Sequence, residues 1–450
     1  MSYTLMDHQR DAIFLMKCNP SLAVYAEMGL GKTAIALSFV LDGMRSGEFK
    51  NAIVVCPASL VPSWKQAIED MILFEGVTEE DVERLKSGVY ITSYQKTYHH
   101  DKTPIHHKDG RVTYKKSLSL REIIDRHWNV MIVDESHSIG THNSIQTKSA
   151  ITLSKLSDRV YLLSGTPFHG PGGRPAYGKM YGQFQVLSKG TRWPTWTKFC
   201  EELVMSYDKW HNPRTFNEDK CKEIIKENSV TYRLADCIDM PERTEQTVPC
   251  PLEETKVYKD VKTGNVTPYG IDIETGGGQY IKLLQICSGS LKRREDTMTL
   301  KTSKDDVLKD LLEGTDEPVV IFCNFRASVD RCVDICKKTG RSVISFDGRS
   351  KGDEWKEFTS GLRNTIVCQY QSGGVGLNLQ RSHVMILYEP CLSALLMEQA
   401  KGRIYRKGQS QKCIYYYLST PKTIESRVLD SVRKGVDVSN DMLIQFAHME

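Results

Sequence analysis

The stretch "SLAVYAEMGLGKTAIALSFV", from Ser21 to Val40, joins an apolar run to a Gly-rich turn and then to an Ala-rich segment. This order is typical of a phosphate-binding loop, in which backbone N–H groups wrap phosphates at a helix N-terminus. The usual pattern G-x-x-x-x-G-K-[ST] begins with glycine, but Ala26 stands at that position. Gly29 and Gly31 would still let the backbone approach a ligand closely. Taken alone, the stretch leaves two interpretations open, a nucleotide site and an accidental Gly-rich turn.

Short apolar runs rich in Val, Ile and Tyr recur along the chain and end in Gly, Pro, Ser or Asp. They lie at 21–27, 51–57, 88–94, 129–135, 159–165, 317–324, 341–348, 364–370, 383–390 and 412–419. Segments of helical length separate them. Continuous apolar strands that alternate with helices predict parallel sheets covered on both faces. We therefore expect an α/β protein with two such units.

The middle of the chain differs, because a Gly/Pro-rich loop at 168–178 is followed by segments of helical character around 193–205 and 217–228. The stretch 236–254, rich in Pro and acids, is predicted to be a crossing linker. The predicted division is an N-terminal lobe (1–168), a helical insertion and linker (169–245), an insertion of the second lobe (246–300), a C-terminal lobe (301–437) and a C-terminal tail (438–450).

The composition is that of a globular protein, with 26% charged residues and a net charge of +4. We find no apolar run of about 18 residues, so no membrane association is expected. Thirteen cysteines without a C-x-x-C pair predict reduced thiols and no structural zinc. The histidine pairs at 99–100 and 106–107 match no standard zinc spacing, so we expect a solvated loop there.

A second chemical element is "VMIVDESH" (130–137), which places two acids at the end of an apolar strand. Asp134 would hold Mg²⁺ through its water shell, and Glu135 would act as general base on the attacking water. Lys32 would supply charge to the β- and γ-phosphates, and Thr33 would offer its hydroxyl to Mg²⁺. The two elements together predict ATP hydrolysis with ATP and Mg²⁺ as cofactors.

A third element, "EQAKGRIYRKGQ" (398–409), places Arg403 and Arg406 three residues apart, on one face if the segment is helical. Two guanidinium groups facing a nucleotide across a cleft would stabilise charge on the transferring γ-phosphoryl group. The alternative is a solvated basic helix, because Lys401 and Lys407 stand beside them.

The three elements resemble those of the Swi/Snf-type ATPases of helicase superfamily two, and the resemblance covers nearly the whole chain. The family motifs occur in order as "LMDHQRDAI" (5–13), "AEMGLGKT" (26–33), "IVVCPASLVPSW" (53–64), "ITSYQ" (91–95), "DESH" (134–137), "LLSGTPF" (162–168), "VVIFCNF" (319–325), "SGGVGLNL" (372–379) and "QAKGRIYRKGQ" (399–409). The first loop position in this family is usually not glycine, which accounts for Ala26. The resemblance implies two RecA-like lobes, each a mostly parallel sheet flanked by helices, with helical insertions between them.

The resemblance also implies roles for individual residues. Gln9 would read adenine, and the other nucleotide contacts would be Met28, Gly29, Leu30, Gly31, Lys32, Thr33 and Gly376. The nucleic-acid contacts would be Pro57, Ser59, Ser93, Tyr94, Asn324, Ser372 and Gly373. The residues that couple the two sites would be His137, Ser164, Thr166 and Gln399. Basic stretches at 108–116 and 292–294 would lie at the duplex surface or simply face solvent.

One motif departs from the family pattern. Where family members usually carry Trp-Asn-Pro, this chain has "YEPCLS" (388–393), which keeps Pro390 but lacks the tryptophan. In contrast, "DESH" and the Arg-Pro of "GGRPAY" look like the branch that contains annealing helicases and fork remodellers.

The function implied is that of an ATP-dependent DNA translocase that tracks on double-stranded DNA and remodels protein–DNA or branched-DNA complexes. The main alternative is a strand-separating or annealing helicase acting at forks. Two further hypotheses are an RNA-dependent ATPase and a catalytically dead ATP-binding or DNA-binding module, which the intact Lys32 and Glu135 disfavour. The expected partners are duplex DNA and a protein that supplies targeting. The expected location is the cytoplasm or nucleoid of a bacterial or viral host cell, or a eukaryotic nucleus.

Overall fold

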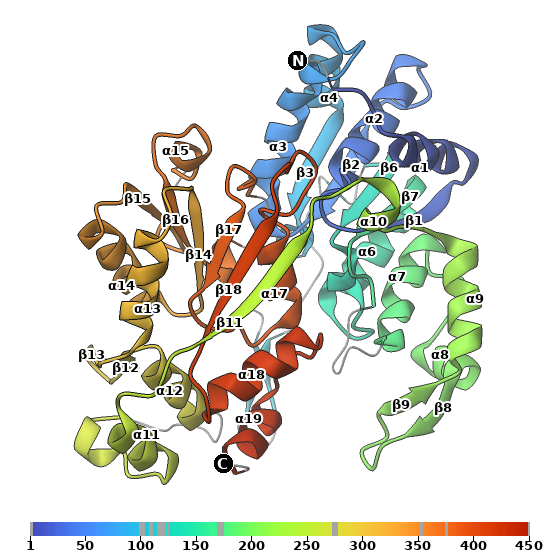
Figure 1. The fold of residues 1–450 in the computed structure, drawn as a ribbon. Coiled ribbons are helices and arrows are strands. Elements are labelled where there is room, and N and C mark those ends of the chain that lie inside the picture. The colour runs from blue at the N-terminus through green and yellow to red at the C-terminus, as the bar shows by residue number, and fades with distance from the viewer. Residues whose placement is uncertain are drawn as a thin grey trace. The chain divides into compact units, whose positions relative to one another are not determined.

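The computed structural model describes residues 3–98, 104–107, 111–114, 123, 126–168, 175–271, 278–350, 354–373 and 377–448. The chain folds as two compact units, a first unit that runs to Asp239 and a second unit that begins at Met240. Each unit is built on a six-stranded sheet with helices packed against it (Figure 1).

The sheet of the first unit has the strand order β10-β1-β7-β6-β2-β3, and all its pairs are parallel. Its strands are β1 (Ser21–Ala26), β2 (Ala52–Cys56), β3 (Val89–Ser93), β6 (Trp128–Asp134), β7 (Ser157–Ser164) and β10 (Ser229–Tyr232). The helices are α1 (Asp7–Cys18), α2 (Lys32–Arg45), α3 (Val61–Asp70), α4 (Glu79–Gly88), α6 (Ile145–Lys155), α7 (Met180–Leu187), α8 (Trp196–Leu203), α9 (Glu218–Asn228) and α10 (Leu234–Cys237). Successive residues of β2 are buried in two different apolar clusters, Val54 in one and Ile53 in the other, so the central sheet is covered on both faces.

The sheet of the second unit has the order β11-β18-β17-β14-β16-β15 and is also parallel throughout. Its strands are β11 (Arg243–Pro249), β14 (Val319–Cys323), β15 (Val343–Phe346), β16 (Thr365–Gln369), β17 (Val384–Leu387) and β18 (Cys413–Ser419). The helices are α11 (Thr255–Lys262), α12 (Gly278–Cys287), α13 (Lys304–Glu313), α14 (Arg326–Lys338), α15 (Lys356–Thr359), α16 (Tyr370–Gly373), α17 (Ala394–Lys401), α18 (Ile424–Arg433) and α19 (Asn440–His448).

All ten strands predicted from the apolar runs are present, and the predicted parallel arrangement is confirmed. The predicted crossing linker 236–254 is wrong in one respect, because it contains β11, whose seven residues pair in register with β18. The segment predicted as a C-terminal tail contains α19, in which Leu443 is fully buried. The polar sequence of β11 hides it from an analysis of apolar runs, whereas α19 carries apolar residues that the sequence analysis did not use.

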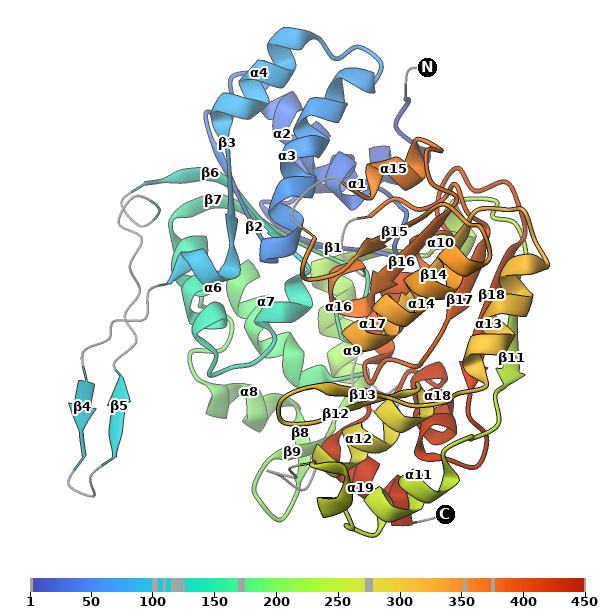
Figure 2. The same ribbon diagram turned by 90° about the vertical axis from the view of Figure 1, so that its left-hand side faces the viewer.

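In the part of the chain that the structure describes, three two-stranded ribbons lie outside the main sheets. They are β4 (Pro104–His106) with β5 (Val112–Tyr114), β8 (Val204–Tyr207) with β9 (Pro213–Phe216), and β12 (Ser290–Lys292) with β13 (Thr297–Thr299). The predicted helical segment 193–205 is shorter than expected, because α8 ends at Leu203 and the β8–β9 hairpin follows. Figures 1 and 2 show this hairpin extending from the end of α8.

No helix in the described part of the chain is long and apolar enough to cross a membrane. All thirteen cysteines are free thiols, and most are buried. Burial raises the pKa of the Cys56 thiol to about 12. Within the described ranges, no cluster of three or more His, Cys, Asp or Glu side chains is placed to hold a metal ion, and the predicted loop pair His99 and His100 lies outside those ranges.

Candidate active site

The loop after β1 is shaped by two glycines with left-handed backbone conformation. Gly29 has φ of 88° and Gly31 has φ of 74°, values that side chains disfavour. A Cβ atom on Gly31 would lie 2.3 Å from Nε2 of Gln9. Helix α2 begins immediately afterwards at Lys32, so its free N–H groups point toward the loop, as anion binding requires.

Two side chains of α1 hold this loop from behind. Both His8 Nε2 and Gln9 Nε2 lie within hydrogen-bond distance of the Leu30 carbonyl, at 3.0 and 3.2 Å. Oε1 of Gln9 accepts a hydrogen bond from the backbone N–H of Met6. Gln9, predicted to read adenine, is therefore buried against the loop with its amide engaged on both sides. His8, which the sequence interpretation missed, shares the same carbonyl.

Lys32 lies between the loop and the turn after β7. Its Nζ donates a hydrogen bond of 2.9 Å to the carbonyl of Ala26, the residue that replaces the usual first glycine. A Cβ atom on Gly165 would lie 3.4 Å from both that carbonyl and Lys32 Nζ. Gly165 therefore lets the turn approach the lysine closely. Thr33 follows in the first turn of α2 and is half-buried, as is Met28 in the loop.

The carboxylates of Asp134 and Glu135 follow β6 at the same end of the sheet. Oδ2 of Asp134 accepts a hydrogen bond of 2.8 Å from the indole N–H of Trp64, and Oδ1 accepts one from the Glu135 backbone. Burial, and then the charge of Glu135, raises the pKa of Asp134 to about 6, against the Trp64 hydrogen bond and the charge of Lys32. The raised pKa shows that the positive charge near Asp134 is too small to offset the effect of burial.

Glu135 has a left-handed backbone with φ of 50°, which is uncommon for a residue with a side chain. Its Oε2 is buried and makes no hydrogen bond, although His137 Nδ1 approaches to 3.4 Å. A left-handed glutamate with an unsatisfied buried oxygen is costly, and such strain is usually retained where chemistry requires it. These groups fit a nucleoside triphosphate with Mg²⁺. Thr33 and Asp134 would hold the cation, and Lys32 and the loop amides would hold phosphate.

The predicted coupling residues of the first unit are adjacent to one another. His137 Nδ1 lies 3.3 Å from the hydroxyl oxygen of Ser164, and that oxygen also accepts a hydrogen bond from the Thr166 backbone. The Thr166 hydroxyl oxygen is buried without a hydrogen bond. The DESH segment and the Ser-Gly-Thr turn are thus in direct contact through side chains.

Gln183 on α7 joins these motifs and was missed from the sequence. It is fully buried, and its Oε1 accepts hydrogen bonds from Ser136 at 2.8 Å and from Tyr25 at 3.3 Å. Its Nε2 donates to the Pro167 carbonyl at 2.9 Å. One amide therefore connects β1, the DESH segment and the turn after β7. No local pattern signals it, because it lies in the segment predicted as an insertion.

The predicted nucleic-acid contacts of the first unit occupy different environments. Tyr94 is 2% exposed, and its hydroxyl donates a hydrogen bond of 2.7 Å to the Asp134 carbonyl. Ser93 is buried as well, whereas Ser59 is exposed and Pro57 half-buried at the end of β2. The Tyr94 side chain therefore positions the backbone at Asp134, whereas Ser59 faces solvent.

Arg403 and Arg406 in the second unit converge on one carbonyl. The Nη1 atoms of both donate to the oxygen of Leu377, at 3.4 and 3.3 Å. The two arginines do not share a helical face, because α17 ends at Lys401 and both lie in the turns that follow. Gln409 holds these turns by donating to the carbonyls of Gln380, Ser382 and Ile404. Burial lowers the pKa of the Arg406 guanidinium.

Asn324, one of the remaining predicted residues of the second unit, is held by a buried glutamate. Oε1 of Glu389 accepts the backbone N–H groups of Asn324 and Phe325, each at 2.8 Å, and its carbonyl accepts the Tyr370 hydroxyl. Tyr370 begins the short helix α16, which also carries Ser372 and Gly373. Glu389 belongs to the segment "YEPCLS" that departs from the family pattern. Its carboxylate fixes the backbone of Asn324.

Two predicted residues complete the set. Gln399 is buried on α17, and Gly376 lies outside the described residues.

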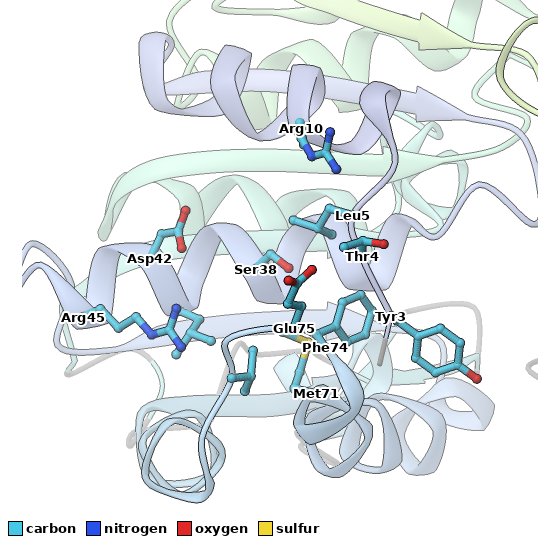
Figure 3. A pocket seen from close by; sticks show the side chains of 12 residues that line it. Tyr3, Thr4, Leu5, Arg10, Ser38, Asp42, Arg45, Met71, Phe74 and Glu75 are labelled. Atoms are coloured by element: carbon cyan, nitrogen blue, oxygen red, sulfur yellow. The ribbon is translucent and has the colours of Figure 1, made fainter. Parts of the chain in front are cut away.

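A pocket of about 290 Å³ opens elsewhere on the first unit, beside α1 and α2 (Figure 3). It is lined by Tyr3, Thr4, Leu5, Arg10, Ser38, Leu41, Asp42, Arg45, Met71, Phe74, Glu75 and Val77. Arg45 is paired with Asp81 at 2.6 Å and Asp42 with Lys17 at 2.7 Å. No residue of the loop 26–33 lines this pocket, and the charged side chains of Asp42 and Arg45 are already paired. We therefore assign the pocket no role in the chemistry.

Family models match the chain over two long segments. Residues 12–279 match the SNF2-related domain, and residues 303–408 match the helicase conserved C-terminal domain. The chain belongs to the SNF2-related family. These matches and the motif geometry together support an ATP hydrolase, as the sequence predicted.

Curated relatives of this SNF2-related chain come from several kinds of organism. It is 24% identical to the DNA repair and recombination protein RDH54 of Saccharomyces cerevisiae, over 90% of this chain and 49% of the relative. It is 23% identical to the uncharacterized ATP-dependent helicase YqhH of Bacillus subtilis, over 95% and 77%. The chain spans about half the length of the yeast relative.

Two further similarities extend this range. The chain is 22% identical to a probable global transactivator of Orgyia pseudotsugata multicapsid polyhedrosis virus, over 92% of this chain and 85% of the relative. Among solved structures, the Sulfolobus solfataricus SWI2/SNF2 ATPase core in complex with dsDNA is 18% identical, with a TM-score of 0.42, over 100% of this chain and 96% of that chain.

Proposed function

We propose that this chain is an ATP-dependent DNA translocase that tracks on double-stranded DNA and remodels protein–DNA or branched-DNA complexes. The observation that carries the proposal is the convergence of Lys32, Asp134 and the Gly165 turn at the carboxyl ends of β1, β6 and β7. Ligands of open parallel sheets bind at that edge. The names of the yeast and bacterial relatives support action on DNA and use of ATP.

In this proposal, different residues of the first unit bind the metal ion, contact phosphate and accept the proton during ATP hydrolysis. Mg²⁺, when bound, would neutralise charge on the β- and γ-phosphates. Thr33 and Asp134 would hold the cation, and Lys32 would exchange its hydrogen bond to the Ala26 carbonyl for a contact with phosphate. Glu135 takes a proton from the attacking water, and its unsatisfied Oε2 is the atom available for this.

Arg403 and Arg406 are proposed to stabilise the negative charge of the transferring γ-phosphoryl group. Their shared carbonyl partner holds the two guanidinium groups side by side within the second unit. The proposed DNA contacts are backbone amides and hydroxyls, such as the exposed Ser59, which position phosphates without reading sequence. Movement would therefore be tolerant of sequence. A separate protein is proposed to supply the target, in the nucleus or nucleoid.

The proposal is tested by the steady-state ATPase rate with no nucleic acid, single-stranded DNA, blunt duplex, forked duplex and RNA. Duplex should stimulate turnover strongly, and displacement of a triplex-forming strand should report movement along it. Lys32→Ala and Glu135→Gln should abolish turnover while leaving DNA binding largely intact. Lys17→Ala is the matched control, because Lys17 is an exposed lysine of the same unit that pairs with Asp42.

Stimulation by single strands or forks alone would favour the strand-separating or annealing class over the duplex-tracking class. Stimulation by RNA alone would favour the RNA-dependent ATPase. Turnover near that of the wild type in Lys32→Ala or Glu135→Gln would remove the proposed site altogether.

A further inference from the structure

The β8–β9 hairpin presents a tryptophan to solvent. Trp210 stands between the two strands and is 75% exposed, the most exposed of the large apolar side chains in the described part of the chain. Met205 and Tyr207 on the same hairpin are also exposed. Large aromatic side chains placed in water on a projecting element usually mark a contact surface.

The conformation of the turn is fixed by Asp208 rather than left to chance. Oδ1 of Asp208 accepts the backbone N–H groups of Trp210 and Asn212, each at 2.8 Å, and Oδ2 accepts the Asn212 side chain at 3.1 Å. His211 takes a left-handed backbone with φ of 63°, and its ring stacks on Tyr207 at 5.2 Å. Because the turn is already ordered, Trp210 can bind with little loss of conformational entropy.

The root of the hairpin is anchored in the core of the first unit. Phe216 lies 6.2 Å from the ring of Phe199, which is fully buried, and Val204 packs against the same cluster. The aromatic tip is therefore carried by a rigid base instead of a loose loop.

The hairpin carries two cations and one acid near Trp210. Lys209 Nζ lies 5.2 Å from the Trp210 ring centroid, and Arg214 is exposed on the same hairpin. Asp208 is the sole acid between Val204 and Phe216, and its carboxylate is occupied by the turn. Cations beside an exposed aromatic face are the combination used to hold single-stranded nucleic acid, in which phosphates meet the cations and a base stacks on the ring.

We propose that the β8–β9 hairpin binds unpaired bases of DNA, with Trp210 stacking on a base and Lys209 and Arg214 contacting the flanking phosphates. Inside a duplex both faces of each base are covered by neighbouring bases, so an indole can stack on an unpaired base only where the two strands separate. The inference rests on the proposed action on DNA and narrows its substrate class to DNA with a junction, such as a fork.

The test compares Trp210→Ala, Trp210→Phe and the control Met205→Ala, which removes an equally exposed but non-aromatic side chain of the same hairpin. The DNAs are a forked duplex with 2-aminopurine at the first unpaired position and a blunt duplex of the same paired length. Trp210→Ala should bind the fork about tenfold more weakly, as expected when one base loses its stacking partner. Its affinity for blunt duplex and its ATPase rate without DNA should not change.

Stacking should also change 2-aminopurine emission with the wild type and with Trp210→Phe and Met205→Ala, but not with Trp210→Ala. Equal fork affinity in Trp210→Ala and wild type overturns the inference, and so does an equal loss on fork and blunt duplex. If duplex stimulates the ATPase of the wild type, and Trp210→Ala matches the wild type in both stimulation and fork affinity, only this inference is overturned. A wild type that neither binds nor responds to any of these DNAs overturns the proposed function as well.

Discussion

The indole N–H of Trp64 donates a hydrogen bond of 2.8 Å to Oδ2 of Asp134, and both side chains are buried. Trp64 lies on α3 and carries no charge, yet its indole holds one oxygen of the carboxylate that is proposed to bind Mg²⁺. A hydrogen bond to the ionised form lowers the pKa of a carboxyl group. Trp64 thus opposes burial, which raises the pKa of Asp134.

Trp64→Phe should move the acidic limb of the turnover–pH profile to higher pH, because Asp134 loses a donor that favours its charged form. The control is Trp193→Phe, whose indole donates to Glu202 away from the site. Both variants should lose similar stability, and only the first should shift the profile. Equal shifts in the two variants would contradict the role given to Trp64.

Asp134→Asn should stabilise the nucleotide-free protein at pH 8 while abolishing turnover. The folded pKa of about 6 lies above the usual value near 3.9, so the folded state binds the proton more tightly than the unfolded state. Stability therefore falls as the pH rises from about 4 to about 6, and the full cost, on the order of 1–3 kcal/mol, remains above that range. Denaturant titrations without Mg²⁺ should show the variant gaining over wild type across this range. A difference that does not change with pH would be the contrary result.

Gln183→Met should lower both stability and DNA-stimulated turnover, because it leaves Ser136, Tyr25 and the Pro167 carbonyl without their partner. The stability loss should be about 2–4 kcal/mol. Gln185→Met is the matched control, since Gln185 is buried on the same helix and donates to the Trp193 carbonyl. Turnover per folded molecule should fall in the Gln183 variant and stay near wild type in the Gln185 variant; the reverse order would exclude Gln183 from coupling.

Arg403→Ala should reduce single-turnover hydrolysis by about 10³-fold or more, whereas the affinity for a fluorescent ATP analogue should change far less. A group that acts on charge developing in the transition state affects the rate more than ground-state binding. Lys407→Ala, which removes an exposed cation of the same segment, should leave both quantities near wild type. Losses of equal size in rate and affinity would rule out a transition-state role for Arg403.

The sequence predicted the central strands well, because β1, β2, β6 and β14 are buried on both faces and are continuously apolar. It missed the edge strands β10 and β11, since edge positions tolerate the polar, half-exposed residues that both contain. An apolar pattern therefore identifies the interior of a parallel sheet better than its borders.

The candidate site shows the same division between local and distant information. Lys32, Asp134 and Glu135 could be singled out because each lies at, or a few residues after, the end of an apolar strand. Trp64 and Gln183 were not singled out, because their importance comes from partners far away in the chain. Arg403 and Arg406 do meet at one place, but through turns that close on Leu377, which residue spacing alone could not reveal.

The positions of β10 and β11 determine where this protein could be divided. A fragment that ends at residue 168 would lack β10 and leave the N–H and C=O groups along one side of β1 bare. Bare strand edges pair with other chains, so such a fragment would self-associate. A fragment that ends at Asp239 keeps β10, and one that begins at Met240 keeps β11 beside β18. A cut in the short stretch between these two strands would therefore leave both strand edges covered.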